Sequence, residues 1–397
     1  MALPDTLALP WPLFVHCNIS GLFLAPVSNL WKIHQIIKGH TELRYATGGF
    51  VRIGPKEISI GNFDGVKHST RSRMPKGSWY QVLQYPGLPL HQPDIGDDPR
   101  RHTEKGKNVA TGYALWNIIK SAGYLGELAL GPVRGFTGTK RRRVQVHLDK
   151  WFNFFLFNIV GEVTFSHSFG FVCSGYIPTS LLLHTCLAAI ESRKRNPEAG
   201  SDMMEQWLSD RNTQPDRMAE EEVFAAAAAN VGAEADVVSS SLQALIYYLL
   251  RNMVYLRGGG VVKYLEEMGL PYLRARMGAY QYHSSNGTNI PRAVPREGIP
   301  FSTSTTVLVN HRTPGIFGTD SISFNPAYKH GLNRGKLGAG YNYCPGRNLA
   351  HFQISKLAAT LLQDYESERA DPAREWVFKN QFITTLWPCW VRRRTAV

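Results

Sequence analysis

The stretch that decides the fold lies near the C-terminus and reads K-L-G-A-G-Y-N-Y-C-P-G-R-N-L-A-H-F-Q-I-S-K-L-A-A-T-L-L-Q, from Lys336 to Gln363. Its single cysteine, Cys344, sits among glycines immediately before a run with helical periodicity. The apolar residues of that run fall on one face of the predicted helix: Ala350, Ile354, Leu357, Ala358 and Leu361. The pattern therefore predicts a cysteine held in a glycine-rich loop at the start of an amphipathic helix.

Three roles are open to a cysteine in this position. It can be a small buried hydrophobic residue, as most cysteines outside disulfides are. It can be a nucleophile activated by the positive end of the following helix, with His311 or His351 as the base. It can also be a thiolate ligand to haem iron. Gly338, Gly340 and Gly346 favour the ligand, because the absence of side chains lets a flat macrocycle approach the backbone.

The composition indicates a folded, basic protein without a disulfide framework. Of the 397 residues, 43% are apolar and 19% are charged, which is enough to build a substantial core. The net charge of +13 favours an acidic protein partner, an anionic membrane surface or nucleic acid. Apart from the run at residues 140–143, which fits a solvated loop, the basic residues are scattered, and no nucleic-acid-binding motif accompanies them, so we expect no nucleic-acid partner. The five cysteines lie far apart without a C-x-x-C pair, which predicts a reducing compartment.

Periodicity predicts a mainly helical chain with a small β part. The stretch F-V-R-I-G-P-K-E-I-S-I, residues 50–60, alternates apolar and polar residues and reads as a β-hairpin. Helical patterns cover three longer segments: residues 98–119, 147–165 and 221–250. Glu234 and Asp236 lie in the middle of the last one, which argues against a membrane span. We therefore expect this helix to cross the protein core and to bury an acidic residue.

No internal repeat or domain-sized linker divides the chain. Residues 7–26 are mostly apolar, but polar residues and prolines interrupt them, and no Lys or Arg precedes Lys32. That pattern fits a signal peptide poorly and is short for a membrane span. We expect residues 1–30 to be an N-terminal leader or degenerate membrane anchor, and residues 31–397 to form a single domain.

The cysteine loop L-G-A-G-Y-N-Y-C-P-G-R-N-L-A resembles the haem-binding loop of the cytochrome P450 family, which usually reads F-x-x-G-x-R-x-C-x-G. Gly340, Cys344 and Gly346 match this pattern. The resemblance implies that Cys344 is the axial thiolate ligand of haem iron. Leu337 replaces the usual phenylalanine, and Asn342 replaces the arginine that meets a haem propionate.

Other segments resemble the fungal microsomal cytochrome P450s, and the pisatin demethylase-like group in particular. The 50–60 hairpin and the aromatic run W-F-N-F-F-L-F-N-I-V-G-E-V-T-F are similar to elements of that group. N-V-G-A-E-A-D-V-V resembles the oxygen-binding groove of the central helix, where Asp236 would serve the proton path. I-P-R-A-V-P-R-E-G resembles the strand whose arginine, here Arg292, reaches a haem propionate, and His102 matches a second propionate-binding residue. The resemblance implies a cytochrome P450-like haem domain over residues 31–397.

The chain departs from the family pattern at four further places. In the central helix, Val237 replaces the threonine that helps deliver protons to dioxygen. The family's Glu-x-x-Arg pair is missing from residues 274–285. His102 is kept, but the arginine that follows it in the family is absent, with Lys107 as the nearest substitute. The segment between Phe171 and Glu221 is short, which predicts that the helices roofing the substrate pocket are shortened.

The resemblance implies a haem-thiolate monooxygenase that inserts one oxygen atom into a small lipophilic substrate, in fungal secondary metabolite biosynthesis. Electrons would come from NADPH through NADPH–cytochrome P450 reductase, and a positive net charge suits docking to an acidic reductase. The implied location is the cytosolic face of the endoplasmic reticulum membrane. The alternative is a decayed or mis-spliced cytochrome P450-derived protein with weak or no haem binding and no catalysis. The missing Glu-x-x-Arg pair and Val237 favour that alternative.

Overall fold

The structure is a computed structural model. The residues it describes are 25, 27–39, 50–55, 57–60, 99–120, 144–177, 182–196, 201–251, 281–283, 300–302, 344–380, 384–387 and 390–395. Within them the chain is mainly helical, with small sheets at its margins. This confirms the predicted fold class, mainly α with a small β part.

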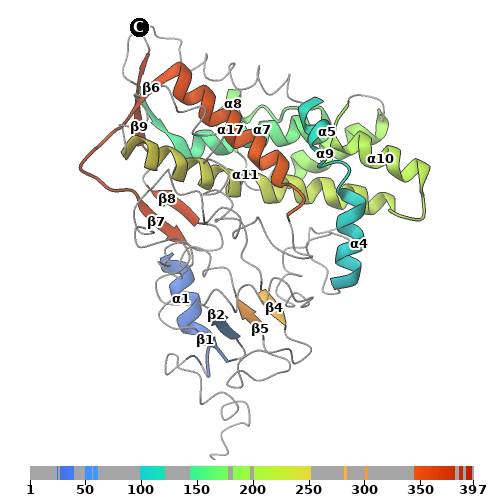
Figure 1. The fold of residues 1–397 in the computed structure, drawn as a ribbon, viewed down its shortest axis with the longest axis horizontal. Helices are drawn as coiled ribbons and strands as arrows, with labels where there is room; N and C mark the ends of the chain where they lie inside the picture. The colour runs from blue at the N-terminus through green and yellow to red at the C-terminus, as the bar shows by residue number, and fades with distance from the viewer. Residues whose placement is uncertain are drawn as a thin grey trace, which may run out of the picture.

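Two long helices form the centre of the helical layer. α7 (Leu148–Phe165) and α11 (Glu220–Arg251) lie side by side and pack against each other (Figure 1). In α7 the rings of Trp151 and Phe155 stack with their centroids 5.5 Å apart, and Phe152 is fully buried. Burial of this aromatic surface removes a large apolar area from water and stabilises the layer. The predicted buried helix is confirmed.

A third helix closes the layer above α11. α17 (Arg347–Asp364) packs against α11 and against the short helix α5 (Leu115–Lys120). Of the residues predicted to share its apolar face, Ala350, Ile354, Leu357 and Ala358 are buried, and Leu361 packs against the core. The amphipathic helix predicted after Cys344 is therefore confirmed.

The predicted polar helical run near residue 100 forms two helices instead of one. α4 (Pro99–Val109) ends where the chain turns, and α5 begins after the turn. In the turn, a Cβ on Gly112 would lie 2.4 Å from the indole Nε1 of Trp207, so glycine is required by the close approach. The same Nε1 donates a hydrogen bond of 3.0 Å to the carbonyl oxygen of Val109. A tertiary contact thus interrupts a locally helical pattern.

The segment between Phe171 and Glu221, as far as it is described, holds three helices: α8 (Phe171–Ser174), α9 (Leu182–Arg195) and α10 (Met203–Thr213). All three pack against α7, and the last two also contact α11. The predicted shortening of the helices over a substrate pocket stays a prediction.

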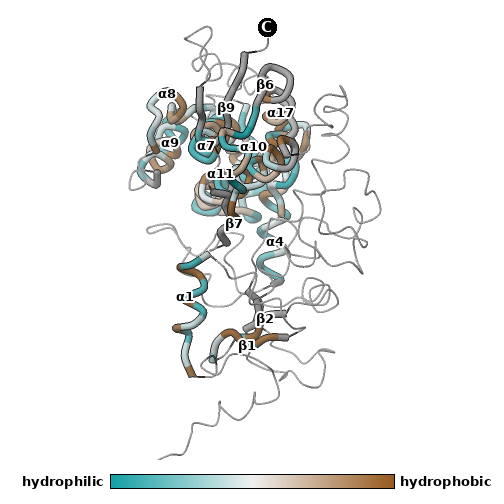
Figure 2. Tube along the Cα trace, turned by 90° about the vertical axis from the view of Figure 1, so that its left-hand side faces the viewer, coloured by the Kyte–Doolittle hydropathy of each residue, from teal (hydrophilic) through white to brown (hydrophobic). Residues whose placement is uncertain are grey.

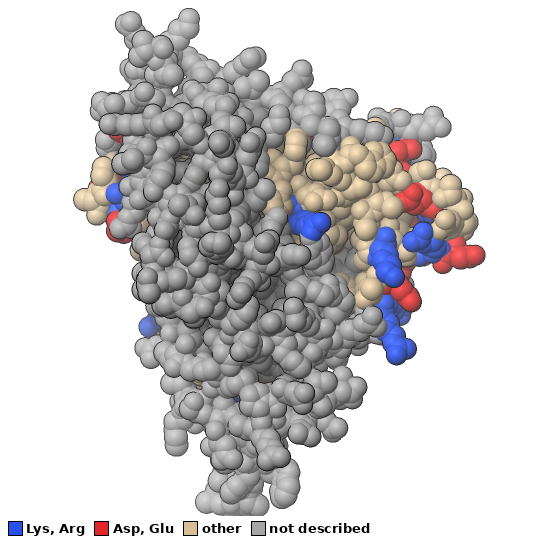
Figure 3. Space-filling view, in the orientation of Figure 1, with Lys and Arg blue, Asp and Glu red and all other residues tan. Residues whose placement is uncertain are grey.

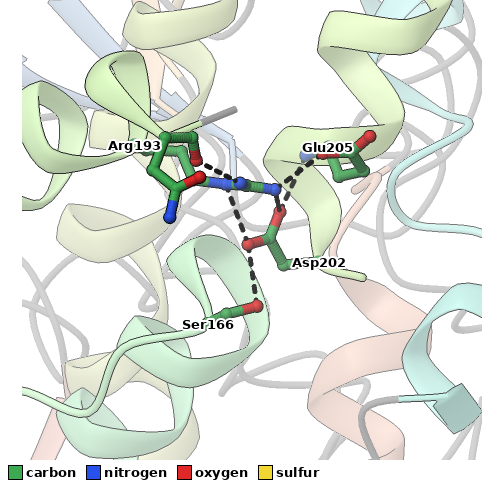
Figure 4. Close-up of polar contacts among 5 residues, drawn as sticks. Ser166, Arg193, Asp202 and Glu205 are labelled. Atoms are coloured by element: carbon green, nitrogen blue, oxygen red, sulfur yellow. Dashed lines mark hydrogen bonds and ion pairs between the residues drawn. The ribbon is translucent and has the colours of Figure 1, made fainter. Parts of the chain in front are cut away.

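A buried ionic cluster joins α9, α10 and the end of α7 (Figure 4). The guanidinium of Arg193 lies 3.2 Å from the Asp202 carboxylate (Nε to Oδ2) and donates a hydrogen bond of 2.8 Å to Glu205. Asp202 caps α10, because its carboxylate accepts a hydrogen bond of 2.7 Å from the backbone N–H of Glu205. The Ser166 hydroxyl, just after α7, donates to the same carboxylate at 2.9 Å. The cluster therefore fixes three helix ends relative to one another.

The strands form three sheets in the described residues, with the orders β1–β2–β5–β4, β3–β9–β6 and β7–β8. They are β1 (Phe50–Gly54), β2 (Glu57–Ile60), β3 (Val144–His147), β4 (Gln281–His283), β5 (Pro300–Ser302), β6 (Tyr365–Arg369), β7 (Val377–Asn380), β8 (Thr384–Trp387) and β9 (Trp390–Thr395). β1 pairs antiparallel with β2, with Phe50 opposite Ile60, which confirms the predicted hairpin. β2 pairs in parallel with β5, far along the chain.

The N-terminal helix lies beside the hairpin, away from the helical layer (Figure 2). α1 (Leu30–Lys38) ends at Gly39, whose φ of 71° is the left-handed conformation that glycine adopts most easily. Leu30, Ile33 and Ile37 share one side of α1 and are 72%, 48% and 70% exposed. Within the described part of the chain, no helix combines the length and apolar character needed to cross a membrane. Residues 1–24 of the predicted leader lie outside the described residues.

Candidate functional site

Cys344 stands where the sequence predicts it, in the turn that leads into α17. The first backbone hydrogen bond of the helix runs from the Ala350 N–H to the Gly346 carbonyl oxygen, at 3.0 Å. The side chain of Cys344 is half-buried and is not in a disulfide. The N-terminal end of a helix carries a partial positive charge and N–H groups without intrahelical partners. Both features stabilise a thiolate next to α17.

Gly346 leaves space beside the sulfur. A Cβ built on Gly346 would lie 3.6 Å from the nearest ring carbon of Tyr113 and 3.9 Å from the Cys344 sulfur. These are ordinary van der Waals contacts, and the φ of Gly346 is not among the positive values of the described residues. Neither backbone conformation nor protein packing therefore requires a glycine at this position. The glycine instead keeps side-chain atoms away from the thiol.

Tyr113 connects the cysteine loop to α11, and sequence reasoning missed it. Its backbone carbonyl accepts a hydrogen bond of 3.2 Å from the Asn348 side chain in α17. Its hydroxyl donates to the Asn230 side-chain oxygen in α11, also at 3.2 Å. The Asn230 amide in turn donates to the Thr164 hydroxyl of α7 at 2.7 Å. No local sequence signal marks Tyr113, since its partners lie in distant segments.

The middle of α11 is open to solvent on one side. Gly232, Ala233 and Asp236 are exposed, while most residues before and after them in α11 are buried. Residues at these spacings share one face of a helix. Of the two acidic residues in the middle of this helix, Asp236 is therefore not the buried acid that the sequence predicts, because its side chain lies on this open face, and the side chain of Glu234 lies outside the described residues. The surrounding protein still desolvates the carboxyl group, and this raises the pKa of Asp236 above its ordinary value.

The residues that follow Asp236 offer no hydroxyl to the open face. Val237 is half-buried, and its carbonyl oxygen accepts hydrogen bonds from both Ser240 (3.0 Å) and Ser241 (2.9 Å). Ser239 is buried and accepts a hydrogen bond of 3.0 Å from the Gln243 amide. A serine hydroxyl that is bonded within its own helix is less available to bond a group outside that helix. The alcohol that Val237 lacks is thus not replaced by a neighbouring serine of α11.

His102 lies on α4 and is half-buried. One turn further along α4, the Lys105 ammonium lies 3.4 Å from the Glu222 carboxylate at the start of α11. Burial lowers the pKa of Lys105, and the nearby Glu222 opposes that shift. Lys107, the nearest replacement for the missing arginine, is exposed. The ion pair fixes α4, and with it His102, against α11.

Arg292 and Gly340 lie outside the described residues, as does most of the stretch that lacks the Glu-x-x-Arg pair. The structure brings Cys344 and Gly346 together at the start of α17. Asp236 lies on α11, against which α17 packs, and His102 lies on α4, which the Lys105–Glu222 pair joins to α11. The roles of these residues stay predictions.

The donor set at the start of α17 fits a haem thiolate ligand. A half-buried thiol outside any disulfide stands at a helix N-terminus, and the nearby Gly346 places no side-chain atoms beside it. The open face of α11 carries an acid beside small residues.

Comparison with known proteins adds distant relatives over nearly the whole chain. No protein-family model matches the sequence. Cytochrome P450 monooxygenase gsfF of Penicillium aethiopicum is 21% identical, over 93% of this chain and 93% of the relative. Pisatin demethylase of Fusarium vanettenii is 23% identical, over 88% of this chain and 83% of the relative. Cytochrome P450 monooxygenase cicH of Emericella nidulans is 22% identical, over 92% and 91% respectively.

Proposed function

Because the chain is a distant, full-length homologue of fungal cytochrome P450s, we propose that it is a haem-thiolate monooxygenase acting on a small lipophilic substrate. Homology implies the cytochrome P450 fold. Within it we propose that residues 31–397 form a single haem domain. The observation that carries the proposal is the position of Cys344 close to Gly346 at the start of α17, where neither packing nor backbone conformation requires a glycine.

Cys344 would hold the iron, and the N-terminal end of α17 would stabilise its negative charge. When bound, the haem supplies the activation of dioxygen that inserts one oxygen atom into the substrate. His102 and Arg292 would hold the haem propionates, and Gly340 and Gly346 would let the macrocycle approach the loop backbone. The absence of a side chain at Gly346, where neither φ nor packing requires a glycine, supports this assignment.

The open face of α11 would form one wall of the reaction site. Asp236 can hold and release a proton there, since its raised pKa lies closer to neutral pH than that of an ordinary aspartate. Val237 can neither donate nor accept a hydrogen bond, and the three serines that follow it are bonded within α11. We therefore expect Asp236 to pass its proton through water or a substrate hydroxyl, with impaired coupling between NADPH consumption and product formation.

An NADPH-dependent flavoprotein reductase would dock beside the cysteine loop. Arg100, Arg101 and Lys107 are exposed on α4, and Trp116 is 51% exposed on α5, which packs against α17. Figure 3 shows Lys and Arg side chains gathered on the right of the molecule, where Figure 1 places α4, with acidic side chains among them. Exposed cations around an aromatic residue suit a complementary acidic surface. We expect the rate of reduction to fall as the salt concentration rises.

The exposed side of α1 would rest on an anionic membrane surface. Leu30, Ile33 and Ile37 form an apolar strip, and Lys38 is exposed at its end. This arrangement supports attachment to the cytosolic face of the endoplasmic reticulum membrane. Replacing Leu30 and Ile37 by Asp should abolish sedimentation with vesicles that contain phosphatidylserine. Unchanged sedimentation would contradict this contact.

The central experiment is a reduced carbon-monoxide difference spectrum of the purified, full-length protein, together with its haem content. Cys344→Ala should remove the thiolate-type Soret band. Cys173→Ala is the matched control, because Cys173 is exposed on α8 and is not in a disulfide. A thiolate-type band that survives Cys344→Ala, or that is lost in Cys173→Ala, contradicts the assignment.

A second candidate is a decayed or mis-spliced cytochrome P450-derived protein that binds haem weakly or not at all. The observation that favours it is the combination of Val237 with serines already bonded inside α11. The haem content of the purified protein distinguishes this candidate from the haem-thiolate monooxygenase. A folded protein with helical circular dichroism and no haem after expression with excess haem precursor would support this candidate.

A further inference from the structure

Tyr113 occupies the junction between the cysteine loop and the helical core. It follows Gly112 in the turn between α4 and α5, and it is 8% exposed. Two carbons of its ring and the Cys344 sulfur lie within 4 Å of the same point, the position of a Cβ on Gly346. The ring and the sulfur are therefore both close to the same glycine.

The far end of the same ring is bound to α11. The Tyr113 hydroxyl donates to the Asn230 side-chain oxygen at 3.2 Å, and Asn230 is 6% exposed. Asn230 also donates to the fully buried Thr164 hydroxyl of α7 at 2.7 Å, so its amide orientation is determined from both ends. In a buried environment, such hydrogen-bonded chains rigidify the groups they connect.

The backbone of Tyr113 is held as well. Its carbonyl accepts a hydrogen bond of 3.2 Å from Asn348, one residue into α17. Its ring meets the Trp207 ring at a centroid distance of 5.8 Å, and Trp207 itself bonds to the Val109 carbonyl. A ring held on these sides has little freedom to move away from the cysteine loop.

From this juxtaposition we infer that Tyr113 is a positioning residue for Cys344. The ring supports the glycine next to the thiol, and the hydroxyl fixes the ring to α11 through Asn230. The distance between the thiol and the open face of α11 is thereby set by one side chain. Tyr113 does not touch the reacting atoms in this role. The expected effect of Tyr113 on haem binding rests on the proposed function. The effect of Tyr113 on the position of Cys344 does not.

The test compares the alkylation of individual cysteines in the full-length protein as purified. Iodoacetamide is added, and mass spectrometry follows the rates at Cys344, Cys173 and Cys186. Cys173 is exposed, so its alkylation rate measures the reactivity of iodoacetamide in each sample. Cys186 is buried, and burial raises its pKa to about 12, so its alkylation rate measures global unfolding. These two cysteines serve as internal references for every variant.

Tyr113→Phe keeps the ring but removes the hydrogen bond to Asn230. Loss of one buried hydrogen bond should raise the alkylation rate of Cys344 about fivefold, with unchanged rates at the other two cysteines. Tyr113→Leu also removes the ring and should raise the rate further. In haem-containing protein, both changes should lower the fraction of haem with a thiolate-type spectrum, Phe less than Leu.

Tyr247→Phe is the matched control. Tyr247 is also buried, and its hydroxyl donates to the Glu375 carboxylate near the other end of α11. This variant should lose a comparable amount of thermal stability without any change at Cys344. An unchanged Cys344 rate in Tyr113→Phe, or an equal rise in Tyr247→Phe, would overturn the inference. If no variant binds haem, the proposed function fails, and the alkylation rates alone decide the role of Tyr113.

Discussion

Arg193 and Asp202 form an ion pair with a distance of 3.2 Å between Nε and Oδ2, and their side chains are only 2% and 1% exposed. The pair joins the end of α9 to the start of α10, and Ser166 connects it to α7. Removing one partner of a buried pair leaves an uncompensated charge inside the protein, which is far more costly than losing the pair as a whole.

Asp202→Ala should lower the free energy of unfolding by about 1–3 kcal/mol, because it leaves the buried Arg193 guanidinium with the partly exposed Glu205 as its carboxylate partner and removes the cap of α10. Urea unfolding followed by circular dichroism measures the change. Glu191→Ala is the control, since its pair with Lys194 is on the surface and should contribute below about 1 kcal/mol. Adding Arg193→Met to Asp202→Ala should recover part of the loss. Equal effects of Asp202→Ala and Glu191→Ala would refute the importance of the cluster.

Gly112→Ala should destabilise the protein by about 1–3 kcal/mol through overpacking. The new Cβ would lie 2.4 Å from the Trp207 Nε1 and would displace the indole from its hydrogen bond to Val109. Gly106→Ala is the contrasting variant, because nothing lies within 4 Å of a Cβ on Gly106 inside α4. It should stabilise by about 0.5–1 kcal/mol. Thermal unfolding should show a lower melting temperature for Gly112→Ala and a higher one for Gly106→Ala. Shifts of the same sign would contradict the close contact between Gly112 and Trp207.

Asp236→Asn should make the protein more stable at pH 7. The folded-state pKa of Asp236 is raised by desolvation, so the folded protein binds this proton more tightly than the unfolded chain. The stabilisation from that proton is present below about pH 4 and is lost as the pH rises through the raised pKa. The advantage of Asp236→Asn should therefore shrink as the pH falls toward 4.

The gain at pH 7 should be below about 1 kcal/mol, because water reaches the exposed side chain and screens the carboxylate. Unfolding in urea at pH 7, 6, 5 and 4 measures the difference between the two proteins. A wild type that is more stable than Asp236→Asn at pH 7 would show that the carboxylate has a favourable partner instead.

Val237→Thr should raise the ratio of oxygenated product to hydrogen peroxide severalfold in haem-loaded protein, if the proposed function is correct. Threonine has nearly the shape of valine and restores a hydroxyl beside Asp236, where the neighbouring serines supply none. Quantifying both products per NADPH with a surrogate reductase measures the ratio.

Val238→Thr is the matched control for this ratio. Val238 is 1% exposed, so its new hydroxyl would be buried away from the open face. It should cost about 1–3 kcal/mol of stability and leave the ratio unchanged. A ratio that stays the same in Val237→Thr, or rises equally in Val238→Thr, would sink the idea that the missing hydroxyl limits proton delivery.

The sequence by itself determined the elements whose signal is local. Helical periodicity and apolar content predicted α7, α11 and α17. Residues three or four apart share one face of a helix, so a helix that packs on the core repeats apolar residues at that spacing, and a helix inside the core is apolar on all sides. Alternation around Gly54 predicted the β1–β2 hairpin. The place of Cys344 at a helix start followed in the same way, from glycines and proline adjoining an amphipathic run.

Tertiary structure alone decided how these elements meet. The polar run near residue 100 splits at the turn that holds Gly112, where Trp207, 98 residues beyond Val109, packs too closely for any side chain at position 112 and donates a hydrogen bond to the Val109 carbonyl. The sequence predicted that α11 buries an acidic residue, but the side chain of Asp236 is exposed, since burial depends on which neighbours cover each face of α11. Tyr113 gains its position from partners in α10, α11 and α17, and its partner Asn230 is in turn bonded to Thr164 of α7. Periodicity is encoded by neighbours in the chain, whereas contacts between distant segments are determined only when the whole core packs.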